Sequence, residues 1–227
     1  MSPNLKLFAI SYAKIRTQQK TKLTMPIPPD QITGLILAGG RAKRMHGQDK
    51  GLVECAGRPL IRYAIDILKP VCGVIYINAN RSLDQYRQFG LPTIQDTTAT
   101  FDGPLAGILA GLNAASTPYL VVIPCDCPKL EPKMLKRLVD TLTSENAEIS
   151  IPHDGRRAHP VIMALRTHLA SSLTAQLAAG ERKIDRWTQK HQCVQIDCSG
   201  NPMQFLNVNS PEDLRRMEQQ LHSNQHE

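Results

Sequence analysis

Two glycines and a group of cations follow the first apolar segment of the chain. Gly39 and Gly40 come directly after the apolar residues 34–38. A glycine loop between a strand and a helix lets backbone N–H groups approach phosphate oxygens closely, because no Cβ intervenes. Four positive side chains lie in the same stretch: Arg41, Lys43, Arg44 and Lys50. We therefore expect this loop to bind a polyphosphate, with a solvated basic turn as the alternative.

Two common phosphate-binding patterns do not occur in this loop. A Walker A loop needs Gly-Lys-Ser or Gly-Lys-Thr after its glycines, and a dinucleotide-binding turn needs G-x-G-x-x-G. The stretch from Gly39 to Lys50 contains neither. The sequence therefore supports neither an ATPase motor nor a nicotinamide-dependent dehydrogenase.

Three polar residues stand at or just after the ends of later apolar runs. They are Asn78, Asp96 and Asp126. Ligands of an open parallel sheet bind beyond the carboxyl ends of its strands, so we expect these residues to share an edge with the glycine loop. An unpaired carboxylate after a hydrophobic strand is costly, so Asp126 should face a cation or several donors. Mg²⁺ suits such a position, because it needs few protein carboxylates.

Plainer interpretations of the same residues stay open. Asp126 could cap a helix that follows Pro128, and Asp96 could form an Asx-turn with Thr97 and Thr98. Both interpretations need no ligand.

Two later groups are further candidates. His153 and His159 flank a pair of arginines, which indicates either a second anionic subsite or an exposed loop. Asn207 and Asn209 alternate along an expected strand and would share one face, either for ligand contact or for strand-end hydrogen bonding.

Apolar periodicity predicts alternating strands and helices. Short apolar runs are typical of strands buried on both faces of a parallel sheet, and stripes spaced by three or four residues are typical of helices. The expected strands are residues 34–38, 74–77, 92–94, 119–123, 149–151, 161–165 and the neighbourhood of 205–206. The expected helices begin at Pro59, after a cap at Ser82 and at Pro104, cover 133–142 and 167–179, and begin again at a capping box, Ser210–Asp213.

This order predicts an α/β fold, doubly wound, with a mostly parallel sheet and helices on both faces. An Asp-Gly pair at 154–155 predicts a turn between two late strands. Since no repeat or low-complexity linker interrupts the pattern, we expect a single domain over residues 32–227. Residues 1–31 are expected to form a basic, disordered extension, of which 1–24 either is a mobile tail or lies upstream of the true start.

Composition and charge exclude several classes of protein. The longest apolar run has about six residues, against roughly 20 for a membrane-spanning helix. The net charge is +7, but residues 1–31 hold five of the 27 basic groups and one of the 20 acidic groups, which leaves +3 for the rest. With 4% aromatic residues, this balance disfavours a nucleic-acid-binding protein. Six irregularly spaced cysteines favour reduced thiols over a disulfide framework or a zinc site.

Several short motifs stand in a fixed order along the chain. They are Leu37-Ala38-Gly39-Gly40, Arg44-Met45, Asp49-Lys50, Gly103-Pro104-Leu105-Ala106-Gly107, Pro124-Cys125-Asp126 and Asn207-Val208-Asn209-Ser210-Pro211-Glu212-Asp213-Leu214. Singly they also occur in other nucleotidyltransferases. Together and in this order they resemble the molybdenum cofactor guanylyltransferases, and the likeness extends from about Ile32 to Leu221.

The resemblance implies a Rossmann-like nucleotidyltransferase fold and a Mg²⁺-dependent reaction. GMP would pass from GTP to molybdenum-molybdopterin, giving molybdopterin guanine dinucleotide and pyrophosphate. The resemblance implies that Lys50 and Asp126 are catalytic and that Asp126 holds the metal. The nucleotide would contact Leu37, Ala38, Gly39, Lys50, Asn78, Asp96 and Asp126. The partners implied are GTP and the molybdopterin, with neither nucleic acid nor a membrane, for a cytoplasmic monomer that contacts cofactor-biosynthesis or acceptor proteins transiently.

One residue of the phosphate loop departs from the family. His46 stands where the family usually has glycine, which either alters loop closure over the phosphates or leaves a side chain pointing outward. The basic N-terminal extension is a second departure. The related cytidylyltransferases tend to have Ala-Ala-Gly where this chain has Ala38-Gly39-Gly40, which favours guanine. The alternatives are a cytidylyltransferase for the same cofactor, a sugar-phosphate nucleotidyltransferase, or a non-catalytic nucleotide- or nucleic-acid-binding protein.

Overall fold

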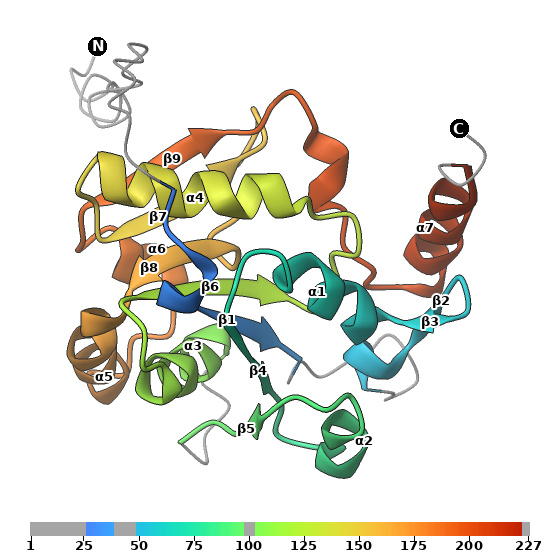
Figure 1. Ribbon diagram of the computed structural model, residues 1–227, viewed down its shortest axis with the longest axis horizontal. Coiled ribbons are helices and arrows are strands. Elements are labelled where there is room, and N and C mark those ends of the chain that lie inside the picture. The colour runs from blue at the N-terminus through green and yellow to red at the C-terminus, as the bar shows by residue number, and fades with distance from the viewer. Residues whose placement is uncertain (1–25, 39–48, 98–102, 224–227) are drawn as a thin grey trace, which may run out of the picture.

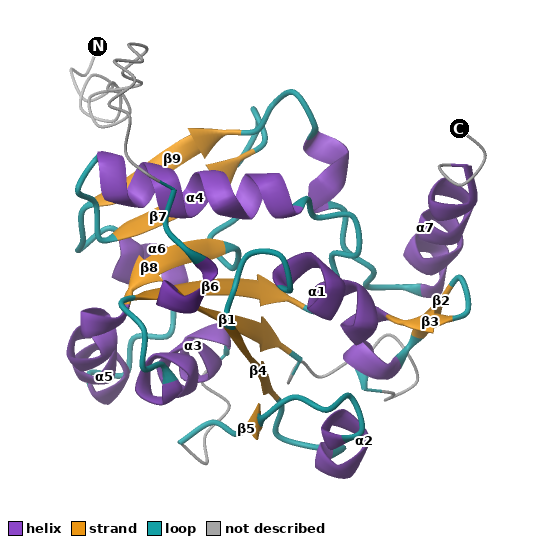
Figure 2. Ribbon diagram, in the orientation of Figure 1, coloured by secondary structure: helices purple, strands orange, loops and turns teal. Residues whose placement is uncertain are grey.

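The computed structural model of the chain describes residues 26–38, 49–97 and 103–223. In these residues seven strands form one sheet and two more form a small hairpin (Figures 1 and 2). Across the sheet the order is β5 (Thr93–Ile94), β4 (Val74–Asn78), β1 (Ile32–Leu37), β6 (Tyr119–Pro124), β8 (Met163–Arg166), β7 (Ile149–His153) and β9 (Cys193–Asp197). The hairpin pairs β2 (Glu54–Cys55) with β3 (Arg58–Pro59).

The helices of the described residues alternate with the strands of the main sheet as far as β7. The α-helices are α1 (Leu60–Leu68), α2 (Leu83–Arg87), α3 (Pro104–Ala114), α4 (Pro132–Ser144), α5 (Ala170–Ala178), α6 (Ile184–Thr188) and α7 (Pro211–Ser223). The 3₁₀ turns are η1 (Pro29–Gln31), η2 (Lys50–Leu52), η3 (Thr167–Leu169) and η4 (Pro202–Phe205).

The strand directions confirm the predicted doubly wound, mostly parallel sheet. β1 runs parallel to both of its neighbours, β4 and β6, and β4 runs parallel to β5. The chain therefore moves from β1 outward through β4 to β5, and then returns to the other side of β1 as β6. β8 is antiparallel to β6 and β7, while β9 is parallel to β7. The reversal of strand order between β1 and β6 is a topological switch point.

Both faces of the sheet are covered, and the side chains of β1 alternate between them. Ile32 and Ile36 join a cluster with α1 and α4, whereas Leu35 joins a cluster with α3 and α5. Figure 1 shows α1 and α4 on one side of the sheet and α3 and α5 on the other. Leu35 and Ile36 are fully buried, and each such side chain stabilises the fold by about 1.5–3 kcal/mol. Burial on both faces explains why the central strands read as continuous apolar runs.

A smaller apolar cluster lies beside the main domain core. It joins Val53, Cys55 and Leu60 of the hairpin region to Val208 and to Met217 of α7. The cluster therefore fixes the late segment around Val208 next to the segment that follows η2.

Two local predictions were wrong. Ser82 does not cap α2: it has φ 52°, in the left-handed region, and its side chain makes no capping hydrogen bond. Residues 205–206 do not form a strand. Pro202 instead opens η4, and the following residues bond elsewhere, as the Val208 N–H donates to the Asp126 carbonyl at 2.9 Å. Asn207 and Asn209 consequently do not share the face of a strand.

Other elements were missed or shifted by one residue. Pro59 precedes α1 and pairs with Glu54 in the hairpin, so the helix begins at Leu60 and not at the proline. The hairpin itself, α6 and β9 were not predicted. β9 is an edge strand with one buried side chain, Ile196, and it lacks the apolar run of a central strand.

Two further findings concern the whole described chain. Among residues 26–38, 49–97 and 103–223, no helix has the length and apolar character needed to cross a bilayer. All six cysteines fall within these residues and are free thiols, five of them buried.

Candidate functional site

Four neighbouring strands, β5, β4, β1 and β6, end at the same edge of the sheet (Figure 1). Leu37 at the end of β1 is in register with Asn78 of β4 and with Pro124 of β6. Just beyond, the Ala38 N–H donates to the Asn78 carbonyl at 2.8 Å, and the Cys125 N–H donates to the Leu37 carbonyl at 3.1 Å. The ends of β1 and β6 are thus level at the switch point, where such folds form a ligand crevice.

A polar cluster at this edge joins three segments that are far apart in the sequence. The Lys50 ammonium group contacts Oδ2 of Asp126 and Oδ1 of Asn209. Lys50 begins η2, Asp126 follows β6, and Asn209 precedes α7. The Lys50 and Asp126 side chains are 14% and 12% exposed, so water screens their attraction only partly. The structure therefore brings together two of the residues that the resemblance implied.

The alternative role of Asp126 as a helix cap is wrong. α4 begins at Pro132, and the preceding residue is Glu131, which makes no side-chain cap either. Asp126 instead has the ammonium group on one carboxylate oxygen and the Cys127 thiol, 3.5 Å away, on the other. It faces a cation, as the sequence predicts for a carboxylate at the end of a buried strand.

Asn209 is held in place by the start of α7. The Asn209 N–H and the Ser210 hydroxyl both donate to Oδ2 of Asp213, at 3.1 and 2.9 Å. The Asp213 N–H donates back to the Ser210 hydroxyl at 3.1 Å, which confirms the predicted capping box. Burial alone would raise the pKa of Asp213, but the hydrogen bonds from Ser210 and Asn209 outweigh it and lower that pKa. The ionised cap thus fixes the backbone from which Asn209 reaches Lys50.

A second polar cluster lies on the other side of β1. The Asn78 side-chain amide donates to Oδ1 of Asp96 at 2.9 Å, and the Asn80 amide donates to Oδ2 at 2.8 Å. The Asp96 N–H donates to Oδ1 of Asn80 at 2.9 Å. The carboxylate is therefore held on both oxygens by β4 and the residues after it. Asn80 was not predicted, although its position two residues after Asn78 was the available signal.

Gly107 allows α3 to pack against this second cluster. A Cβ on Gly107 would lie 2.4 Å from Oδ1 of Asn78 and 2.8 Å from a methyl group of Leu37. Real side chains do not tolerate such distances, so glycine is required for the close approach of α3 to the sheet edge.

Asp49, directly before Lys50, is a second buried acid at this edge, besides Asp126. Its side chain is 4% exposed. The Tyr86 hydroxyl donates to one carboxylate oxygen, and the Arg81 Nε lies 3.4 Å from the other. Asp49 belongs to the Asp49-Lys50 motif, but the sequence predicts no role for it, because neither partner is near it in the sequence.

The residues from 153 to 159 form a turn at the end of β7. Asp154 accepts hydrogen bonds from the N–H groups of Arg156 and Arg157, both at 2.7 Å, which confirms the predicted turn. The His159 ring bonds the same carboxylate at 2.8 Å and stacks on Phe205 with a centroid distance of 4.3 Å. The hydrogen bonds from Arg157 and His159 lower the pKa of Asp154. His159 is thus a packed residue of the turn and not an exposed one.

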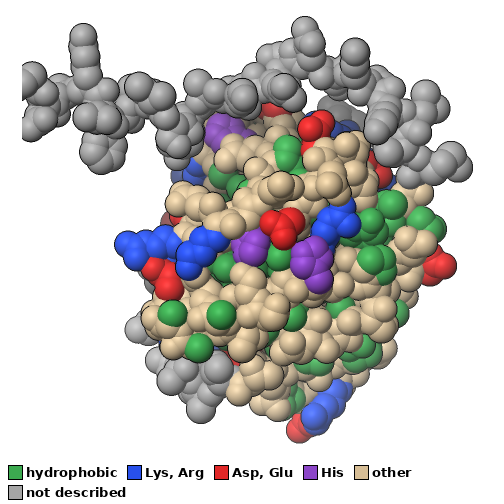
Figure 3. Space-filling model, turned by 90° about the vertical axis from the view of Figure 1, so that its left-hand side faces the viewer, with side chains coloured by type: hydrophobic (Ala, Val, Ile, Leu, Met, Phe, Trp, Pro, Cys, Tyr) green, Lys and Arg blue, Asp and Glu red, His purple; other side chains and the backbone are tan. Residues whose placement is uncertain are grey.

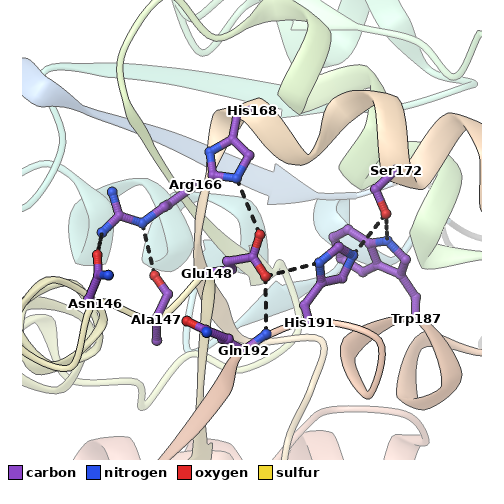
Figure 4. Close-up of polar contacts among 9 residues, drawn as sticks. All are labelled: Asn146, Ala147, Glu148, Arg166, His168, Ser172, Trp187, His191 and Gln192. Carbon is purple, nitrogen blue, oxygen red and sulfur yellow. Dashed lines mark hydrogen bonds and ion pairs between the residues drawn. The ribbon is translucent and has the colours of Figure 1, made fainter.

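A further cluster of polar side chains lies at the opposite end of the strands, away from the carboxyl ends of β1 and β6. Figure 4 shows Glu148, which accepts hydrogen bonds from the Gln192 N–H at 3.1 Å, from His191 at 3.3 Å and from His168 at 3.4 Å. His191 in turn bonds the Ser172 hydroxyl at 2.8 Å. A shallow cleft of about 460 Å³ adjoins this group, lined by Asn146, Glu148, Arg166, His168 and Gln192. On this face, histidine, acidic and basic side chains lie next to one another (Figure 3).

Among the described residues, no group of three or more histidine, cysteine or acidic side chains is arranged to hold a metal. Mg²⁺ does not need such a group, because it keeps several waters and binds phosphate oxygens of its substrate. Asp126 fits this requirement: it is a mostly buried carboxylate at the switch point and already takes a cationic group.

Some predicted site residues lie outside the described part of the chain. Leu37 and Ala38 stand at the end of β1, but Gly39 belongs to residues 39–48, which are not described. The same holds for the remaining cations of the loop and for His46.

A family model and curated relatives indicate one family, and solved structures share the fold. Residues 34–194 match the MobA-like NTP transferase domain. A molybdenum cofactor guanylyltransferase of Shewanella loihica is 44% identical over 191 residues, which cover 84% of this chain and 97% of the relative. That of Shewanella halifaxensis is 45% identical over 187 residues, covering 82% and 94%. The crystal structure of molybdopterin-guanine dinucleotide biosynthesis protein A from Archaeoglobus fulgidus is 22% identical, covers 84% of this chain and 99% of its own, and superposes with a TM-score of 0.70.

Proposed function

The chain belongs to the MobA-like NTP transferase family, and we propose that it transfers GMP from GTP to molybdenum-molybdopterin. The products are molybdopterin guanine dinucleotide and pyrophosphate. The observation that carries this proposal is the meeting of Lys50, Asp126 and Asn209 at the switch point, with a second polar cluster on the other side of β1. A triphosphate laid across the end of β1 would lie between them.

We assign the phosphates of GTP to the Lys50 side of β1 and the nucleoside to the Asp96 side. The resemblance assigns contacts with the nucleotide to Leu37, Ala38 and Gly39, and Leu37 and Ala38 stand between the two sides at the end of β1. Asn78 and Asp96 are opposite Lys50 and Asp126, and amide and carboxylate groups suit the hydroxyls of ribose or the donor edge of guanine.

The proposed reaction is an in-line attack by the terminal phosphate of molybdopterin on the α-phosphorus of GTP, with pyrophosphate leaving. A phosphate oxygen is anionic at neutral pH, so no strong general base is required. Catalysis then consists of positioning and charge neutralisation. Lys50 offsets the negative charge that gathers toward the leaving pyrophosphate, and its bond to Asn209 fixes the direction of its long side chain.

Asp126 is the residue that would hold Mg²⁺. When bound there, the metal supplies positive charge that neutralises phosphate oxygens. Asp126 is well placed, because its backbone carbonyl is bonded by Val208 and its side chain follows a buried strand. The six unpaired cysteines support a reducing compartment such as the cytoplasm.

The assay that tests the proposal is magnesium-dependent release of pyrophosphate with GTP and molybdenum-molybdopterin. We expect release that needs both substrates, and little release when CTP replaces GTP. Turnover with CTP at the rate of GTP would identify a cytidylyltransferase instead. GTP binding without turnover, under conditions in which a known guanylyltransferase is active, would identify a non-catalytic protein.

A further inference from the structure

The buried carboxylate of Asp49, directly before Lys50, contacts α2 and the segment between β4 and α2. We propose that Asp49 is a positioning residue, which holds Lys50 in register with the Asn78–Asn80–Asp96 cluster. The inference rests on the proposed function, since it concerns how the same nucleotide site is kept in shape.

The backbone of Asp49 leads directly into the turn that carries Lys50. The Leu52 N–H donates to the Asp49 carbonyl at 3.0 Å, and the Val53 N–H donates to the Lys50 carbonyl at 3.3 Å. Lys50 is thus the first residue of a single tight turn. A shift of the Asp49 carboxylate moves the start of this turn, and with it the base of the lysine side chain.

The first contact of the carboxylate ties this turn to α2. Tyr86 is fully buried, and its hydroxyl donates to Oδ1 of Asp49. Burial is the largest of the causes that raise the pKa of the Tyr86 hydroxyl, so this group keeps its proton and remains a donor. A Cβ on Gly51 would lie 2.5 Å from this hydroxyl oxygen. Glycine at position 51 therefore lets the tyrosine reach the acid.

The second contact ties the turn to the residues after β4. The Arg81 Nε lies 3.4 Å from Oδ2 of Asp49, whose side chain is 4% exposed. A carboxylate that is buried to this extent needs a cationic partner, and the Arg81 guanidinium group supplies one. Arg81 directly follows Asn80, whose amide holds Asp96. One carboxylate therefore links the Lys50 turn to the segment that fixes the Asp96 cluster.

This linkage makes a distinct prediction for catalysis. Asp49 contacts neither of the proposed substrate-binding clusters through its side chain, so it acts through the position of Lys50. A displacement of about 1 Å in a positioned group can cost about 10²-fold in rate. Asp49→Asn keeps the shape of the side chain and removes its charge, so we expect kcat/KM for GTP to fall by about that factor.

The test is a double-mutant cycle in the full-length protein. Asp49→Asn, Lys50→Ala and the double variant are compared for GTP binding by equilibrium dialysis and for pyrophosphate release with molybdenum-molybdopterin. If Asp49 acts through Lys50, Asp49→Asn weakens GTP binding in the wild-type background and changes it by less than about threefold in the Lys50→Ala background. Equal effects in both backgrounds would overturn the inference, because a general structural role does not depend on Lys50.

Two further variants keep the cycle interpretable. Asp66→Asn removes an exposed ion pair with Arg58 elsewhere on the surface and should leave GTP binding unchanged. Should Asp49→Asn fail to fold, Tyr86→Phe removes one hydrogen bond to the same carboxylate, and its loss of GTP affinity should likewise disappear in the Lys50→Ala background. A wild-type protein that does not bind GTP would overturn the proposed function and this inference with it. If the wild-type protein binds GTP and the Asp49→Asn variant binds it equally well, only the inference about Asp49 is overturned.

Discussion

At the scale of single residues, the site depends on a mostly buried ammonium group shared by two oxygen acceptors. Lys50 contacts Asp126 and Asn209, 76 and 159 residues away in the sequence. Asp126 was predictable as a ligand-facing acid, because it ends a buried strand where a lone carboxylate is unfavourable. Its pairing with Lys50 was not predictable from residue spacing, because Lys50 lies in the turn η2 and not at the end of a strand. The contacts of Asp49 were equally hidden, since Tyr86 and Arg81 lie beyond the next helix and strand.

The ion pair predicts an asymmetry between activity and stability. Lys50→Ala should lower turnover by about 10²-fold or more, and also destabilise the fold by about 3 kcal/mol, because Asp126 is left as a buried, unpaired charge. Lys50→Ala combined with Asp126→Asn removes that charge. The double variant should be as inactive as the single one, yet more stable in urea unfolding. A double variant that is less stable than Lys50→Ala would contradict the ion pair.

Gly107 predicts a defect through close packing. Gly107→Ala places a methyl group where Oδ1 of Asn78 and a methyl of Leu37 now lie. Helix propensity alone would make alanine stabilising by up to about 1 kcal/mol, but overpacking of a filled interior costs about 1–3 kcal/mol. We expect a net loss of stability and a raised KM for GTP, measured by thermal unfolding and steady-state kinetics. Gly111→Ala, which meets Leu35 instead, is the matched control: it should destabilise without raising KM. Stabilisation by Gly107→Ala would show that Asn78 is not held as described.

At the scale of elements, the central strands and the amphipathic helices could be predicted from the sequence. The edge strand β9 and the short hairpin strands β2 and β3 could not. β1 and β6 are buried on both faces and β4 over most of its length, so their apolar runs stand out. β9 lies at the edge and buries one side chain, and β2 and β3 have two residues each. The apolar pair Phe205–Leu206 predicts a strand, but Phe205 ends η4 and the segment after it bonds to the loop after β6, where the Val208 N–H donates to the Asp126 carbonyl. Only the tertiary structure decides this pairing.

The hydrogen bonds of Glu148 with Gln192, His191 and His168 predict a pH-dependent contribution to the stability with which β7, α5 and β9 pack together. The Gln192 N–H, followed by His168 and His191, lowers the pKa of Glu148 below its ordinary value. A depressed folded-state pKa stabilises the fold above the unfolded value, near 4.5, and that contribution is lost as the pH falls through the folded value.

Glu148→Gln should therefore destabilise the protein by about 1 kcal/mol near pH 6, with a difference that shrinks below pH 4.5. The measurement is urea unfolding of both proteins from pH 3 to pH 8. Since Glu148 lies at the opposite end of the strands, GTP kinetics should stay unchanged. A stability difference that grows toward pH 3 would contradict the assigned direction of the shift.

At the scale of the whole molecule, the family assignment and the geometry of the site support each other. The molybdenum cofactor guanylyltransferase of Shewanella loihica matches along 84% of this chain and 97% of its own length, and the strands β5, β4, β1 and β6 have the order of a doubly wound nucleotide-binding fold. We propose that residues 32–227 form one domain, because β1 through β9 belong to one sheet apart from the small hairpin, which packs through Val208 and Met217.

The most direct test of the account is a crystal structure of the protein with Mg²⁺ and a GTP analogue that cannot be cleaved at the α-phosphate. We predict that the triphosphate lies across the end of β1 within hydrogen-bond distance of Lys50, that Asp126 faces it through the metal, and that the nucleoside lies on the side of Asn78 and Asp96. The account would be contradicted by a nucleotide bound elsewhere, such as in the cleft beside Glu148. It would also be contradicted by a nucleotide that lies beyond the reach of Lys50 and Asp126 and leaves the bond between them untouched.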